Sequence, residues 1–238
     1  MHGTRRTAKE AANGTGRVAG RADRNGGRAG RKGGRVRHPE RTRQRILEAA
    51  TAEFSAHGLG GARVDSIARA ARVNKRMLYH YFGNKEDLFL AVLERAYENI
   101  RRQESALALD DLAPVEAMRR LVRFTFDYFV GNQYFVALLN SENLHKARHI
   151  RRSPRATSIN RPIVGALGRI LRRGRKVGVF RGSVDPLQLY ISIAGIAYFY
   201  FSNIHTLSTI FARDLNSPKA LAERRKHVTE VILGYLRR

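Results

Sequence analysis

The stretch from residue 64 to residue 82, VDSIARAARVNKRMLYHYF, carries the most distinctive chemistry in this chain. Its second half places four basic and aromatic side chains close together, namely Lys75, Arg76, Tyr79 and His80. Lysine and arginine pair with phosphates, and arginine, tyrosine and histidine also form hydrogen bonds at base edges. These residue types predict a surface that contacts nucleic acid.

Small and apolar residues between these positions indicate how the stretch folds. They are Ile67, Ala68, Ala71, Val73, Leu78 and Tyr81. Their spacing buries one face of a first helix, passes a turn, and buries one face of a second helix that crosses the first. The pattern predicts a helix-turn-helix that reads DNA. We expect Tyr81 and Phe82 to belong to the core, and half-buried packing is the alternative role for Tyr79.

The composition points to a polyanionic partner. The chain has 238 residues, a formal net charge of +25 and a pI near 11.4. Such a charge favours nucleic acid first and an anionic membrane second. The sequence contains no cysteine, which excludes disulfides, thiolate metal sites and a thiol redox sensor.

Residues 1–38 differ from the rest of the chain. They hold 11 Lys and Arg, two acidic residues and nine glycines. Because this segment has too little apolar surface to offset its chain entropy, we expect it to be disordered. No apolar run follows the basic start, so it is not a secretory signal. Two interpretations stay open: a tail that adds phosphate or minor-groove contacts, and a solvated extension produced by a wrongly chosen upstream start codon.

The remaining segments predict an all-α fold with a three-helix head. A first helix is expected over 39–57, ended by a left-handed Gly58 with Leu59 as its apolar contact. Asn74 is expected to cap the second motif helix. Asn84 is expected to cap a fourth helix that runs to about residue 102, and Asp87, three residues later, would complete a capping box. The head and this connecting helix form an expected DNA-binding domain of residues 39–102.

A larger helical body is expected over residues 103–238. The predicted break at 103–113 is followed by helices that begin at Pro114, Gln133, Ser158, Pro186 and Pro218. Between Pro186 and Ala212 there is no charged residue. Because polar side chains interrupt this segment, we expect a buried core or interface helix and no membrane span.

One cluster in the body has metal-ligand residue types. Glu142, His145 and His149 would share a face if they stood on one continuous helix. The surrounding HKARHIRR is strongly basic and would repel a cation. We therefore expect neither a metal nor a cofactor.

The segment from residue 41 to residue 102 resembles the DNA-binding head of the TetR family of transcriptional regulators. The runs that carry the resemblance are RQRILEAATAEFSAHG, VDSIARAARV and LYHYFGNKEDLFLAVLE. The remainder resembles the family's regulatory body in helix count, in length and in the Gly-Val-Phe-Arg turn before residues 185–186. Many relatives have glycine in the turn where this chain has Arg72. A left-handed conformation is easy for glycine, whereas this bulky residue would have to take it or avoid it. Relatives also often have Thr in place of Arg63, and Gly or a small residue in place of Arg76 and Met77.

The resemblance implies roles for individual residues. Arg63 would lie over a phosphate, Lys85 would hold a backbone phosphate together with main-chain amides, and the residues in or beside the major groove would be Asn74, Lys75, Arg76, Tyr79 and His80. In the body, polar groups among apolar neighbours would hold a small-molecule effector of unknown identity. The candidates are Asn140, Asn143, Gln188, Tyr198 and Asn203, with His205 beside them.

These expectations combine into a dimeric, ligand-responsive, cytoplasmic and nucleoid-associated repressor. Its partners would be double-stranded DNA, a second copy of the chain and the effector. The two heads would bind half-sites about 34–36 Å apart in a near-palindromic operator. The alternative is an architectural or RNA-binding protein that uses the basic tail. An enzyme is not expected, because the sequence offers no Ser/His/Asp order, no P-loop and no convincing metal site.

Overall fold

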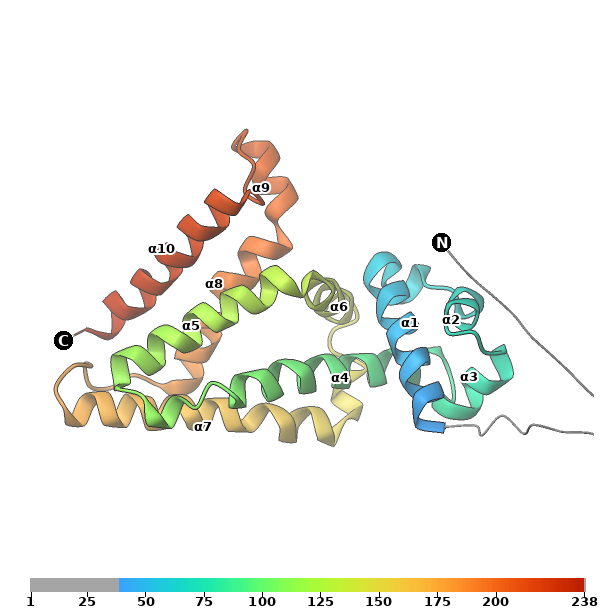
Figure 1. The fold of residues 1–238 in the computed structure, drawn as a ribbon, viewed down its shortest axis with the longest axis horizontal. Coiled ribbons are helices and arrows are strands. Elements are labelled where there is room, and N and C mark those ends of the chain that lie inside the picture. The colour runs from blue at the N-terminus through green and yellow to red at the C-terminus, as the bar shows by residue number, and fades with distance from the viewer. Residues whose placement is uncertain (1–38, 238) are drawn as a thin grey trace, which may run out of the picture. The chain divides into compact units, whose positions relative to one another are not determined.

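Figure 1 shows the computed structural model, in which residues 39–237 are described. Every regular element in this range is a helix, as predicted. The expected disorder of residues 1–38 lies outside the described residues.

Helix α1 (Pro39–Gly61) buries the predicted stripe of Ile46, Ala50 and Phe54. Gly58 has φ 63 and ψ 178. These angles are not helical, so the helix is interrupted directly after His57, where its end was predicted, and the positive φ of Gly58 agrees with the expectation. A short helical segment follows the kink and extends the element to Gly61. Leu59 is buried, as its expected apolar contact requires.

The helix-turn-helix consists of α2 (Val64–Ala70) and α3 (Lys75–Phe82), followed by α4 (Lys85–Ser105). Ile67, Ala68 and Leu78 are buried in a core shared with α1 and α4. Phe82 is also buried, whereas Tyr81 is half-buried against the same core. The predicted pattern of buried positions is confirmed.

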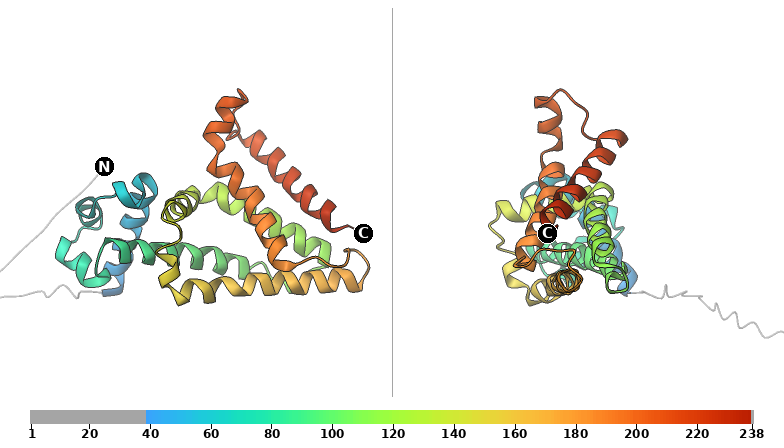
Figure 2. Two further views of the ribbon diagram at one scale, coloured as in Figure 1. Left: turned by 180° about the vertical axis from the view of Figure 1, so that it is seen from behind. Right: turned by 90° about the vertical axis from the view of Figure 1, so that its left-hand side faces the viewer.

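The body contains the remaining helices. They are η1 (Leu109–Asp111), α5 (Pro114–Gly131), α6 (Gln133–Leu144), η2 (Ile150–Arg152), α7 (Pro154–Lys176), α8 (Pro186–Ser202), α9 (Ile204–Ile210) and α10 (Pro218–Leu236). Helices α4 and α7 lie side by side, and α5 packs against α7, α8 and α10 (Figures 1 and 2).

Three body helices begin with a capped proline. Ser153, Asp185 and Ser217 each accept a hydrogen bond from the amide three residues ahead, and proline follows each cap. This arrangement satisfies one free amide, while proline has no N–H to leave unsatisfied. The starts at Pro114, Pro186 and Pro218 are confirmed. The helix that Ser153 caps is α7, and it begins at Pro154 rather than at the predicted Ser158.

The expected break at residues 103–113 is shorter than predicted. Helix α4 continues to Ser105, and η1 occupies part of the connection. As a result Glu104 lies on the last turn of α4 and is buried.

The uncharged segment forms α8 and α9, which are bent by 65° where they meet. Leu189, Ile193 and Ala197 face the core, as expected for a core or interface helix. No single helix among the described residues is long and apolar enough to cross a membrane, and only the bent pair together meets the criteria of length and composition.

Candidate nucleic-acid interface and effector cavities

The turn between α2 and α3 is closed by hydrogen bonds that require a left-handed residue. The Val73 amide donates to the Ala68 carbonyl at 3.0 Å, and the Arg72 amide donates to the Arg69 carbonyl at 3.1 Å. This pair of bonds is a Schellman motif, whose left-handed residue is usually glycine. Arg72 has that position here, with φ 53. The arginine therefore takes the left-handed conformation rather than avoiding it.

Helix α3 is capped as predicted. The Asn74 side-chain oxygen accepts a hydrogen bond from the Met77 amide at 2.8 Å. Because this oxygen is engaged in the cap, the Asn74 NH₂ group is the part of the side chain left for a contact with DNA.

The outward side of α3 gathers four of the predicted contact residues. Lys75, Arg76, Tyr79 and His80 are all exposed, and Tyr79 is 40% exposed. Side chains three or four positions apart are neighbours on a helix, and the pairs 75/79, 76/79 and 76/80 have these spacings, so the four side chains share one side of α3. We call these four residues the recognition face. It presents cationic, phenolic and imidazole groups together, the mixture that phosphate and base contacts require.

Lys75 has an acidic neighbour on the preceding helix. Its Nζ lies 3.1 Å from Asp65 Oδ1 and donates a hydrogen bond to Oδ2 at 3.2 Å. This hydrogen bond, followed by the negative charge of Asp65, raises the pKa of Lys75. The lysine stays protonated, but Asp65 offsets part of its attraction for a phosphate.

The two remaining predicted phosphate contacts flank the motif. Arg63 precedes α2, its side chain is exposed, and its amide donates to Glu53 Oε1 at 2.8 Å. Lys85, the first residue of α4, is half-buried, with its Nζ 3.4 Å from the Gly60 carbonyl oxygen. Asn84 caps that helix through the Asp87 amide at 2.8 Å.

The start of α4 is also held by arginines that precede α7. Arg148 forms an ion pair with Glu86, and Arg152 lies 2.5 Å from Asp87. At the end of α1, the Leu59 amide donates to Ser141 Oγ of α6 at 3.1 Å. Contacts from both α1 and the start of α4 therefore connect the head to the body.

Glu142 and His149 form a buried pair. Glu142 Oε2 lies 2.6 Å from His149 Nδ1, and Oε1 accepts hydrogen bonds from the amides of His149 and Ile150, both at 2.9 Å. Helix α6 ends at Leu144, so these residues do not share a helix face. Both carboxylate oxygens are engaged in fixing the chain between α6 and η2, and no cluster of metal-ligand residues occurs within the described range.

The structure does not gather the predicted effector residues. Tyr198 donates a hydrogen bond to the side-chain oxygen of Asn140, which is the one hydrogen bond between these candidates within residues 39–237. The Asn203 amide group donates to the Phe199 carbonyl at 2.9 Å, while Asn143 and Gln188 are exposed. His205 is exposed as well.

A cavity of about 690 Å³ lies between the end of α4, η1 and α7. Ile159, Pro162 and Ile163 form an apolar part of its wall, and Arg101 and Glu104 contribute charged groups. Arg101 Nη1 lies 2.6 Å from Glu104 Oε2, and Nη2 donates to the Tyr190 hydroxyl at 3.1 Å. No local pattern in the sequence predicts this cavity, because Glu104 lies in the segment 103–113 that was expected to be a break.

Glu104 has an unusual environment for a carboxyl group. Burial raises its pKa to about 7, and the attraction of Arg101 opposes this increase only in part. Perturbed titratable groups in cavities are frequent at ligand sites.

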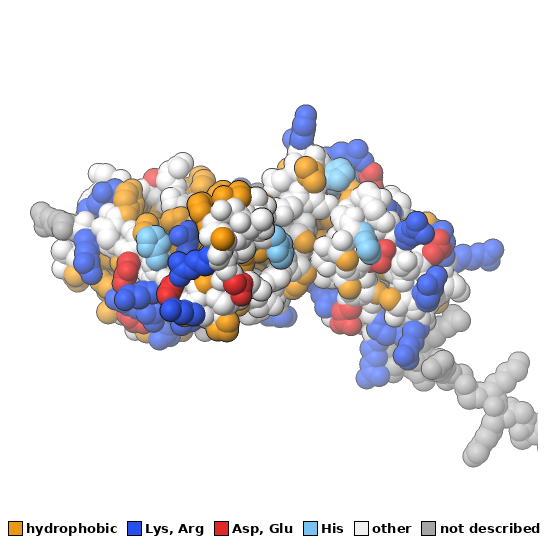
Figure 3. Space-filling view, turned by 90° about the horizontal axis from the view of Figure 1, so that it is seen from above, with side chains coloured by type: hydrophobic (Ala, Val, Ile, Leu, Met, Phe, Trp, Pro, Cys, Tyr) orange, Lys and Arg blue, Asp and Glu red, His pale blue; other side chains and the backbone are white. Residues whose placement is uncertain are grey.

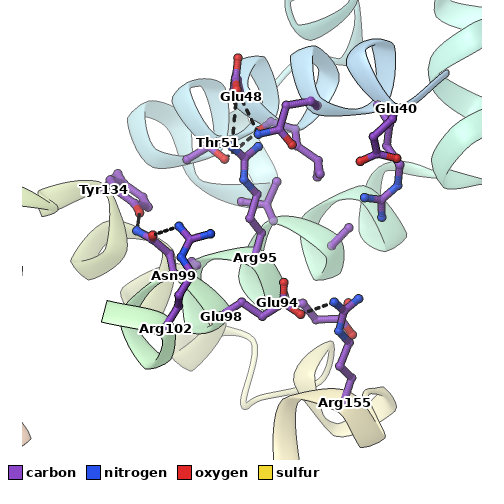
Figure 4. A pocket seen from close by; sticks show the side chains of 16 residues that line it. Glu40, Glu48, Thr51, Glu94, Arg95, Glu98, Asn99, Arg102, Tyr134 and Arg155 are labelled. Atoms are coloured by element: carbon purple, nitrogen blue, oxygen red, sulfur yellow. Dashed lines mark hydrogen bonds and ion pairs between the residues drawn. The ribbon is translucent and has the colours of Figure 1, made fainter. Parts of the chain in front are cut away.

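Two other cavities lie near the head. One of about 620 Å³ lies between α1 and α4 (Figure 4), where Arg95 pairs with Glu48 at 3.5 Å and Arg155 pairs with Glu98. Since its lining holds four acidic and four basic residues, it favours neither anions nor cations. Another, of about 390 Å³, lies between α1, α6 and the α8–α9 bend, and Asn140 and His205 line it.

Two family models match the chain. Residues 46–92 match "Bacterial regulatory proteins, tetR family", and residues 114–232 match "Tetracyclin repressor-like, C-terminal domain". The HTH-type transcriptional repressor NicS of Pseudomonas putida is 41% identical over 199 residues, which cover 84% of this chain and 94% of that protein. The HTH-type transcriptional repressor SCO4008 of Streptomyces coelicolor is 58% identical over 60 residues, which are 25% of this chain and 31% of that protein.

Solved structures agree with these matches. The putative transcriptional regulator SCO4942 of Streptomyces coelicolor is 27% identical with a TM-score of 0.63, over 82% of this chain and 98% of that one. FadR of Bacillus subtilis, solved with stearoyl-CoA, has a TM-score of 0.61 at 16% identity over 82% and 99% of the chains, and it supports the fold alone. The matched head, the matched body and the extent of identity with NicS show that this chain belongs to the TetR family of transcriptional regulators.

Proposed function

We propose that this protein is a dimeric, ligand-responsive repressor that binds a near-palindromic operator in the cytoplasm. The observation that carries the proposal is the recognition face, held on a capped helix inside a TetR-type head. Family membership, and NicS being a repressor, favour this function over an architectural or RNA-binding protein that works through its tail. They also indicate a regulatory rather than a catalytic role.

The recognition face would enter the major groove. Arg76 and Tyr79 would reach base edges, while Lys75, with Arg63 and Lys85 on either side, would contact phosphates. Asn74 and His80 would complete the surface. In this arrangement base contacts set the operator sequence, and phosphate contacts set affinity and its salt dependence.

The dimer would form through α8 and α10. Both helices leave apolar side chains in solvent although each packs against the body: Leu187, Ile191 and Phe199 of α8 are 49%, 52% and 58% exposed, and Val231 and Tyr235 of α10 are 42% and 47% exposed. Gly195 and Gly234, on the same two helices, have open space beside them. Small residues among exposed apolar ones allow helices of two copies to approach closely, which supports a four-helix interface.

The effector would bind in the cavity of about 690 Å³ between α4 and α7. Its volume lies in the range of small-molecule sites, and its wall combines apolar residues with a buried ion pair. A molecule bound there contacts α4, which begins directly after the recognition helix. An effector that prefers one position of α4 would change the spacing of the two heads and release the operator.

Selection from random duplex DNA with the purified protein tests the repressor function. The expected result is enrichment of a near-palindrome with half-sites one helical turn apart. Deletion of residues 1–38 should weaken binding without changing the selected sequence. The proposal would be contradicted if the protein enriched no sequence, or if deletion of residues 1–38 abolished all DNA binding.

A further inference from the structure

Three arginines line a small hollow where α7 meets the start of α8. The hollow has a volume of about 150 Å³, and its charged lining consists of Arg172, Arg175 and Arg181. Gly168, Leu171, Ser183, Val184 and Pro186 complete it. No carboxylate is among its described lining residues. We call this hollow the arginine pocket.

The three guanidinium groups lack the partners that arginines usually have. In the described part of the chain none of them forms an ion pair, whereas the neighbouring Arg169 lies 3.0 Å from Asp110. The nearest acid along the chain is Asp185. Its Oδ1 caps α8 by accepting from the Gln188 amide at 2.8 Å.

The surrounding backbone holds these arginines in place. The Arg181 amide donates to the Leu236 carbonyl at 2.9 Å, and the Arg181 guanidinium lies 3.7 Å from the centre of the Tyr235 ring. A side chain at Gly174 would collide with the Phe180 ring at 1.9 Å, so glycine lets the connection fold tightly onto the end of α7. Arg172 Nη1 would lie 3.3 Å from a Cβ at position 168, and Gly168 therefore leaves room for it.

Ser183 adds a second, independent feature. It lines the pocket with φ 60, a left-handed conformation that a non-glycine residue adopts at an energetic cost. Residues held in such conformations are frequent at ligand sites, where the surrounding structure fixes them. Here the residue in this conformation lines the same hollow as three arginines.

We propose that the arginine pocket binds the phosphate group of a small phosphorylated molecule. Arginine forks match phosphate oxygens through paired hydrogen bonds, and a serine hydroxyl donates one more. Three like charges around one small hollow repel one another, and a bound dianion removes that repulsion. The volume of the hollow equals that of a few water molecules, so it suits a single phosphate group better than the row of phosphates along a DNA strand. The pocket lies at the end of α7 remote from α3 (Figures 1 and 2).

The site differs from the proposed effector cavity and from the recognition face. It borders the start of α8 and, through Arg181 and Tyr235, the end of α10. Occupation by phosphate would stabilise the end of the body where the proposed dimer helices meet α7. The proposal does not require that the protein is a dimer or that it binds an operator.

Calorimetric titration of the full-length protein with pyrophosphate, at moderate ionic strength, tests the site. The test variant is the double substitution R172Q/R175Q, and the matched control is R161Q, which removes an exposed arginine of the same helix outside the pocket. Both are exposed-surface changes, and circular dichroism checks that each variant folds. The single substitutions R172Q and R175Q replace the double one if it does not fold.

The expected result is a binding event that the double substitution weakens by at least about tenfold and that R161Q preserves. Equal weakening by both variants would show general attraction to a cationic protein and would overturn the proposal. Unchanged binding in the double variant would overturn it as well. A loss of nonspecific DNA affinity equal to the loss of pyrophosphate binding would assign these arginines to a DNA strand instead.

Discussion

Lys75 Nζ lies 3.1 Å from Asp65 Oδ1, so a cation of the recognition helix is held by a carboxylate of the helix before it. Both side chains are exposed, and the pair contributes little to stability. If α3 enters the DNA groove as proposed, a phosphate near Lys75 would also be near the negative charge of Asp65. We therefore expect Asp65 to reduce the nonspecific attraction between this chain and DNA.

Replacing Asp65 by Asn should therefore strengthen binding to random duplex DNA and make its salt dependence steeper by about one unit in slope. Fluorescence anisotropy over a series of salt concentrations measures both quantities. Asp127→Asn is the matched control, since Asp127 pairs with Arg225 at 2.9 Å on the body. An unchanged slope in Asp65→Asn would place Lys75 outside the DNA interface.

Arg72 leads to a prediction about stability. Because it occupies the left-handed position of a Schellman motif, Arg72→Gly should stabilise the fold by about 1 kcal/mol and raise Tm by roughly 2–4 °C. Arg123→Gly, at an exposed position inside α5, should destabilise by about 1 kcal/mol instead. Thermal unfolding followed by circular dichroism compares the two. If Arg72→Gly lowers Tm, the arginine side chain makes contacts that outweigh its strain.

Local signals in the sequence were sufficient for most of the fold. Caps such as Asn74 and Ser217 act through amides three residues away, and the buried stripe of α1 has a helical period, so neither needs tertiary information. The contacts that were missed join segments far apart in the chain. Glu142 and His149 could share a face only on one continuous helix, whereas α6 ends at Leu144. The hydrogen bonds from the amides of His149 and Ile150 to Glu142 depend on how the chain folds back after that helix, which local patterns do not specify.

The candidate sites divide in the same way. The recognition face follows from one short helix, and its residues are exposed together. The polar residues expected to hold the effector lie on several helices, and their packing depends on how those helices cross. Asn143 and Gln188 consequently face solvent, while Arg101 and Glu104 form a charged wall that no local pattern predicted.

Glu104 predicts a pH dependence of stability. Its pKa is raised from 4.5 to about 7. Between these pH values the carboxyl is therefore protonated in a larger fraction of folded than of unfolded molecules. Its contribution is therefore present at low pH and is lost as the pH rises from about 4.5 to about 7. Glu104→Gln should remove this loss. The loss in the free energy of unfolding that Glu104 causes between pH 5 and pH 8 should be on the order of 3 kcal/mol at most.

Urea unfolding of the wild type, Glu104→Gln and the surface control Glu116→Gln at the two pH values measures the effect. The wild type and the control should both lose stability on going to pH 8, and Glu104→Gln should lose less. Parallel behaviour of all three proteins would mean that the carboxyl is ionised throughout and is stabilised by Arg101.

The proposed dimer predicts different effects for two exposed apolar residues. Figure 3 looks onto the side of the molecule where α9 lies and shows hydrophobic side chains gathered near the middle of that face. Phe199 of α8 is 58% exposed, whereas Leu144, at the end of α6, is 83% exposed. If α8 and α10 form the interface, Phe199→Glu places two charges in an apolar contact related by two-fold symmetry, where both must be desolvated.

Phe199→Glu should thus give a folded monomer in light scattering and should weaken binding to a two-half-site operator far more than binding to one half-site. Leu144→Glu should leave both mass and binding unchanged, although it removes a more exposed apolar side chain. Because Phe199 points into solvent, its substitution does not disturb the core, and a loss of mass can be read as loss of the interface. A Phe199→Glu protein that remains dimeric, or a Leu144→Glu protein that dissociates, would move the interface away from α8 and α10.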